Sequence, residues 1–140
     1  SVANVLLVVN DSTPAGEQIA KRYSQRRGLP SSNVCHVVTA AVETISRTQY
    51  VQAIEQPIWQ CIAKTDGQDR ILYIVLTKGM PLRIEGTGDR TGTVASVDSE
   101  LTLLYRRRAG YAAGIEQREV GEPHRHIEGN AVVAHAALDA

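Results

Sequence analysis

The sequence predicts an α/β domain in three layers, with a parallel sheet of strand order 2-1-3 and crossover helices on its faces. Three short apolar runs lie at residues 4–10, 33–38 and 70–78. The first contains VLLVV (5–9), which is uninterrupted and rich in β-branched residues and is typical of a strand buried on both faces. The intervals between them carry helix signals and are long enough for right-handed crossovers between parallel strands.

The first predicted helix connects strands one and two and has a cap at each end. Thr13 suits the N-cap, and Pro14 suits the first helical position, where its missing N–H costs nothing. Gly28 is placed to end the helix in the left-handed conformation, and Pro30 prevents its continuation.

The second predicted helix begins with a capping box, in which Ser46 is the N-cap and Gln49 is the third helical residue. An apolar stripe follows and is expected to face the sheet, through Tyr50, Ile54, Ile58 and Ile62. Pro57 interrupts the stripe, because proline removes a backbone hydrogen bond and clashes with the preceding turn. We expect a kink there, or two helices of which Pro57 opens the second.

Beyond the third strand the pattern weakens. Residues 85–93 form a glycine-rich loop without the strand-to-helix context of a dinucleotide fingerprint and without GK[ST]. Residues 96–105 predict a third helix, capped by Ser96 or Asp98. Residues 106–140 show no sustained helix or strand period, so we expect an α/β domain over residues 1–105 and a divergent, poorly ordered tail.

The composition argues against several partner classes. The 15 basic and 15 acidic residues give a formal net charge of zero, so no overall field favours nucleic acid. No apolar run reaches the ~18 residues that a membrane span needs. The histidines at 124 and 126 lie with His135 in a segment without a predicted scaffold, and His36 is interpreted as a core histidine. We therefore expect no metal and no cofactor.

The two cysteines, Cys35 and Cys61, fall in a predicted strand and a predicted helix. Their spacing matches neither a metal site nor a CxxC pair. Both are interpreted as small core residues, and a disulfide between them remains an open alternative.

The candidate site lies at the carboxyl ends of the strands, where open α/β sheets bind ligands. Asn10 and Asp11 leave the first strand, and Lys78 leaves the third. We expect Lys78 to line a crevice with Asp11 and one carboxylate of Asp98 or Glu100, and the crevice to accept a small anionic ligand. The alternatives are a lysine that extends into water and carboxylates that only cap a helix.

Four segments resemble an uncharacterised bacterial family found in genomes with exosortase-type protein-sorting systems. They are NVLLVVNDSTPAGEQIAKRYSQRRGLPSSNVCHV, ETISRTQYVQAIEQPI, ILYIVLTKGMPLRI and ASVDSEL, within residues 4–105. The resemblance implies an exported protein, usually with a leader peptide; the sequence opens directly on a strand-like run, so we expect that a leader has been removed or that this is an excised piece. The resemblance implies no activity and no catalytic residues. After Tyr105 the chain departs from the family, and we expect a truncated, divergent or frame-shifted copy there.

A weaker resemblance, in the order of strands and helices, is to the N-terminal part of gingipain-type cysteine peptidases. It implies a caspase-like arrangement as the alternative to a flavodoxin-like one. The catalytic His and Cys of such enzymes come later in the chain than the matched part, and Cys35 and Cys61 are not in the position of the nucleophile.

Three functions are compatible with these observations. We favour a noncatalytic or incomplete α/β domain of an exported bacterial protein. The second is a peptidase-like hydrolase whose crevice is lined by Asn10, Asp11, Lys78 and Asp98, and whose intact form needs a second half. The third is a flavodoxin-like module that binds an anion or a nucleotide.

Overall fold

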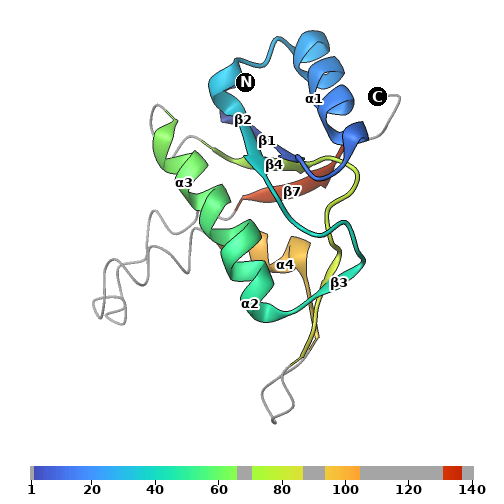
Figure 1. The fold of residues 1–140 in the computed structure, drawn as a ribbon. Helices are drawn as coiled ribbons and strands as arrows, with labels where there is room; N and C mark the ends of the chain where they lie inside the picture. Colours follow the sequence, from blue (N-terminus) through green and yellow to red (C-terminus); the bar gives the residue numbers. More distant parts are fainter. Residues whose placement is uncertain (1, 66–70, 87–93, 105–130, 137–140) are drawn as a thin grey trace, which may run out of the picture.

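A four-stranded parallel sheet runs through the computed structural model, which describes residues 2–65, 71–86, 94–104 and 131–136. The strands are β1 (Val5–Asn10), β2 (Val34–Val37), β4 (Tyr73–Leu76) and β7 (Val132–His135). Their order is β2-β1-β4-β7, and all three pairings are parallel. The predicted order 2-1-3 is therefore confirmed, and β7 extends the sheet beyond β4 (Figure 1).

Helices cover both faces of this sheet, as the three-layer prediction requires (Figure 1). One face packs against α1 (Pro14–Arg27), and the other against α2 (Arg47–Tyr50), α3 (Gln56–Lys64) and α4 (Val97–Thr102). Alternate residues of β1 supply the two cores. Leu7 and Val9 pack with Ala20 of α1, whereas Leu6 and Val8 belong to the larger core with Ile58. A strand that is buried on both faces needs the unbroken apolar run seen in β1.

The helix caps follow the local signals. Thr13 is the N-cap of α1, and Gly28 ends that helix with a φ of 65° and an N–H bond to the Ser24 carbonyl. The Ser46 hydroxyl accepts from the Gln49 N–H, and the Gln49 side chain accepts from the Ser46 N–H, which completes the capping box. Ser96 caps α4 by accepting from the Ser99 N–H.

Pro57 lies in the first turn of α3, but the backbone is helical without a break from α2 to α3, so the expected two separate helices are not found (Figure 1). A π-helical turn, η3 (Val51–Glu55), joins α2 to α3 and was not predicted. In a regular α-helix the Pro57 ring would clash with the Ala53 carbonyl, four residues earlier. The wider turn contains Ala53, and the Gln56 N–H bonds to the Val51 carbonyl across it.

A second, small sheet joins the chain after β2 to the chain after β4. It contains β3 (Thr44–Ile45), β5 (Arg83–Ile84) and β6 (Ala95–Ser96), in the order β3-β5-β6. The β3–β5 pair is parallel, and the β5–β6 pair is antiparallel. Two residues are too few to show a strand period, which is why the sequence did not predict these elements. The short 3-10 turns η1 (Val2–Asn4) and η2 (Ser31–Asn33) precede β1 and β2.

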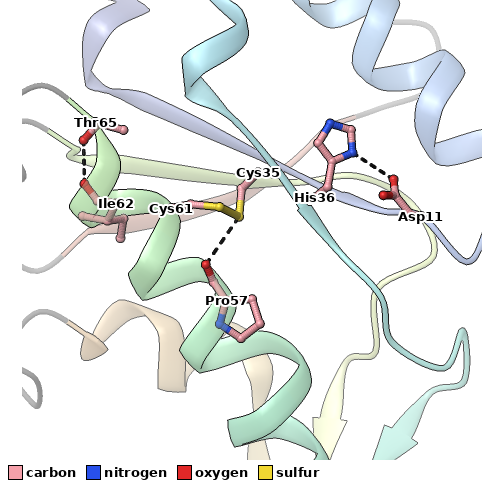
Figure 2. The surroundings of a disulfide bond; sticks show 7 residues. All are labelled: Asp11, Cys35, His36, Pro57, Cys61, Ile62 and Thr65. Atoms are coloured by element: carbon pink, nitrogen blue, oxygen red, sulfur yellow. Dashed lines mark hydrogen bonds and ion pairs between the residues drawn. A yellow bond between two sulfur atoms is a disulfide. The ribbon is translucent and has the colours of Figure 1, made fainter.

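A disulfide joins Cys35 of β2 to Cys61 of α3, with 5.8 Å between their Cα atoms. Figure 2 shows the bond between strand and helix. Cys35 belongs to the larger core and Cys61 packs against it, in agreement with the interpretation as core residues, and the disulfide that the sequence left open is present. Cys35 Sγ also lies 3.7 Å from the Pro57 carbonyl oxygen, which is a packing contact because a disulfide sulfur carries no hydrogen. The disulfide thus fastens an edge strand of the sheet to the helix that covers it.

The expected tail is only partly testable, because residues 105–130 and 137–140 lie outside the described residues. Residues 131–136 do not behave as a poorly ordered tail. The Val132 N–H donates to the Leu72 carbonyl, the Ala136 N–H donates to the Leu76 carbonyl, and Ala131 is buried. The boundary predicted at Tyr105 was therefore wrong for this segment. Four strand residues show too little periodicity to be recognised, and their partner β4 is distant in the sequence.

Val133→Asp tests whether β7 belongs to the sheet. The Val133 side chain packs against the larger core, so a carboxylate there should lower the free energy of unfolding by about 1–3 kcal/mol. Val132→Asp is the matched control, because that side chain is 55% exposed and points to the other face. Urea denaturation measures both variants. Equal, small effects would contradict the placement of β7.

Candidate functional site

Asn10 lies completely buried at the end of β1 and joins three segments of the chain. Its Nδ2 donates to the carbonyls of Thr39 (3.1 Å) and Gly79 (2.9 Å). Its Oδ1 accepts from the N–H groups of Ser12 (3.1 Å) and Thr39 (3.2 Å). These four bonds use the two donors and two lone pairs of the amide. Asn10 therefore connects the segments that follow β1, β2 and β4. Its amide is buried and fully hydrogen-bonded, so it has no polar atom left to bind a ligand.

Gly79 brings the turn after β4 against the start of α1. Its φ is +100°, and a Cβ at this position would lie 3.0 Å from Thr13 Cγ2 and 3.1 Å from Thr13 Oγ1. Thr13 Oγ1 in turn donates to the Asn10 carbonyl at 3.1 Å. Both the backbone angle and the space therefore require glycine directly after Lys78.

Asp11 does not pair with Lys78. Its Oδ1 lies 2.9 Å from His36 Nδ1, and the two side chains are 44% and 52% exposed (Figure 2). The interpretation of His36 as a core residue was therefore wrong, because β2 is an edge strand whose alternate side chains reach solvent. An exposed pair of this kind contributes about 0–1 kcal/mol to stability.

The two acidic residues of α4 face different neighbours. Glu100 Oε1 accepts from Arg47 Nη1 of α2 at 2.9 Å. Asp98 Oδ2 lies 2.7 Å from His135 Nε2 at the end of β7. Each predicted crevice acid therefore has a different partner: His36 for Asp11, His135 for Asp98 and Arg47 for Glu100. Lys78 forms no salt bridge with any residue in the described ranges.

A pocket of about 460 Å³ lies at the carboxyl ends of β4 and β7. Its lining is Leu76, Thr77, Lys78, Gly79, Met80, Leu82, His135 and Ala136. Lys78 lines this pocket, which lies between β4 and β7, whereas the crevice was expected between the first and third strands, β1 and β4. The Thr77 hydroxyl donates to the Val8 carbonyl at 3.0 Å and is buried, so it is held by the sheet.

His135 is the site residue that sequence reasoning did not select. Its only local signal is its place at the end of the short run AVVA. The partner Asp98 lies 37 residues earlier, and the pairing of β7 with β4 brings the two together. Without that strand pairing, the sequence offered no reason to combine these two residues.

Neither protein-family models nor curated proteins nor solved structures match the chain. Among the described residues, no three His, Cys, Asp or Glu side chains are grouped to hold a metal ion. No helix in these residues has the length and apolar character to cross a membrane. Most of the glycine-rich loop, from residue 87 to 93, lies outside the described part of the chain.

Asn10→Ala tests the role of the buried amide. The substitution leaves buried backbone groups of Thr39 and Gly79 without their partner, so it should lower the free energy of unfolding by about 2–4 kcal/mol. The neighbouring substitution Asp11→Ala removes an exposed pair and should cost less than about 1 kcal/mol. Thermal or urea unfolding compares the two. A loss for Asn10→Ala no larger than for Asp11→Ala would contradict the structural role.

Proposed function

We propose that this chain is a noncatalytic α/β domain of an exported bacterial protein, and that it binds a small anionic ligand in the pocket at the ends of β4 and β7. The observation that carries the proposal is Lys78. It lines a pocket whose other residues are mostly apolar, and it forms no salt bridge within the described ranges. Lys78 is itself exposed, so it can reach an anion at the mouth of the pocket, and solvent partly screens the attraction.

The absence of an available nucleophile in the described part of the site supports binding over hydrolysis. Cys35 and Cys61 are joined in the disulfide, so neither is a free thiol. The Thr77 hydroxyl is committed to the Val8 carbonyl. Ser96 and Ser99 lie within hydrogen-bonding distance of each other at the start of α4, where Ser96 acts as the cap. The described residues thus offer a charged pocket without the activated side chain that a covalent peptidase needs.

The disulfide supports export. Disulfides form and persist in oxidising compartments and are rare in a reducing cytosol. The pair Cys35–Cys61 links a strand to its covering helix, which is a structural rather than a catalytic position. Free thiols at both positions in protein taken from the producing cell would count against this part of the proposal.

Lys78→Met tests the binding function. The substitution keeps an unbranched apolar stem and removes the charge, so it should weaken the binding of acetate and inorganic phosphate by roughly tenfold or more while the fold is retained. Lys64→Met is the matched control, since Lys64 is also exposed but lies at the end of α3 and does not line the pocket. NMR titration measures both. Failure of the unmodified protein to bind any anion, or equal weakening by the two substitutions, would refute the proposal.

A further inference from the structure

We propose that the ligand of this pocket is a carboxylate with an aliphatic body, and that His135, oriented by Asp98, is a second group that holds the carboxylate. This inference rests on the proposed function, because it names the chemical class of the anion. It assigns Lys78 as the charge, His135 as a specificity-determining residue and Asp98 as a positioning residue.

The Asp98–His135 contact leaves one imidazole nitrogen available. His135 Nε2 lies 2.7 Å from Asp98 Oδ2, and an ionised carboxylate only accepts hydrogen bonds, so Nε2 carries a hydrogen. The bond orients the ring and leaves Nδ1 as the remaining polar atom of a residue that lines the pocket. The ring is only partly screened from solvent, since 45% of the side chain is exposed, so a ligand can approach it.

The charges of the site favour a monoanion. Lys78, from the turn after β4, lines the same pocket as His135, and Asp98, from α4, contacts the imidazole. If Nδ1 takes a proton from the solvent when a carboxylate binds, His135 becomes an imidazolium between two carboxylates. Lys78, the imidazolium, Asp98 and the ligand then sum to zero charge. A carboxylate accepts hydrogen bonds only, so a ligand carboxylate held by Nδ1 requires a proton on that nitrogen.

The rest of the lining indicates an aliphatic body rather than a phosphate ester. Leu76, Met80 and Leu82 supply hydrocarbon surface, and no arginine is among the described residues that line the pocket. Phosphate sites commonly use arginine forks or several backbone N–H groups, whereas one lysine and one imidazole suit a single carboxylate. A volume of about 460 Å³ is within the usual range for small-molecule pockets.

A chain-length series tests the ligand class by isothermal titration calorimetry on the full chain. The probes are acetate, butyrate and hexanoate, with hexanol as the uncharged analogue and inorganic phosphate as the compact anion. Affinity should rise about fourfold for each buried methylene, and hexanol should bind at least about tenfold more weakly than hexanoate. N-acetylleucine forms a separate arm that compares a peptide carboxyl end with a free aliphatic acid. Tighter binding of hexanoate would indicate a free aliphatic acid as the ligand, and tighter binding of N-acetylleucine would indicate a peptide carboxyl end. Both results support a carboxylate ligand.

His135→Gln should weaken hexanoate binding about tenfold and abolish proton uptake, measured in two buffers of different ionisation enthalpy. His36→Gln is the matched control, because His36 also pairs with an aspartate but does not line the pocket. Asp98→Asn keeps a hydrogen-bond acceptor for Nε2 and should retain more affinity than Asp98→Ala, which tests orientation separately from folding.

The outcomes separate this inference from the proposed function. If no anion binds, both fail. If phosphate or acetate binds through Lys78 but affinity does not depend on chain length, the ligand class is overturned and the binding function stands. If His135→Gln and His36→Gln behave alike, the role of His135 is overturned.

Discussion

The amide of Asn10 is buried at the end of β1, and it bonds backbone groups of Ser12, Thr39 and Gly79. These groups belong to three chain segments that leave neighbouring strands. A parallel sheet fixes its strands through the ladder of hydrogen bonds, but its strand ends have no such ladder. A fully satisfied buried amide supplies the missing connections, and any other side chain would leave buried backbone groups without partners.

The position of the pocket follows from this connection. Because Asn10 bonds the Gly79 carbonyl, and Gly79 packs closely on Thr13, the turn that carries Lys78 has little freedom to move. Strand β7 then forms the far side of the pocket and brings His135 to the same edge. Asp98 approaches from α4 and orients the imidazole. The proposed ligand site is therefore formed by residues at the carboxyl ends of β4 and β7. Its best-anchored segment is the turn after β4.

Local signals in the sequence predicted the local features well. The three strands and the caps at Thr13 and Ser46 depend on neighbouring residues, and each was found where expected. At Pro57 the helix continues, and the proline is accommodated by the π-helical turn before it. The rule that ligands bind at the carboxyl edge of an open sheet led to Lys78, which lines a pocket at that edge, although not the crevice expected between β1 and β4.

The features that were missed depend on contacts between distant residues. The pairs Asp11–His36 and Asp98–His135, and the disulfide, each join elements that only the finished sheet brings together. Asn10 was selected as a crevice residue, but its role is structural, because the sequence could not show that three chain segments converge on its side chain. Strand β7 was missed because four residues beside a distant partner carry little signal of their own.

Amide hydrogen exchange of Thr39, measured by NMR on the unmodified protein, is the most direct test of the role of Asn10. Thr39 lies in a connection outside the strands, and its N–H donates to Asn10 Oδ1 at 3.2 Å. If Asn10 holds the strand ends, this amide should be protected to the same degree as the Thr77 amide, which bonds the Val8 carbonyl within the sheet. Exchange as fast as that of Val42, whose side chain is exposed in the same connection, would contradict the account.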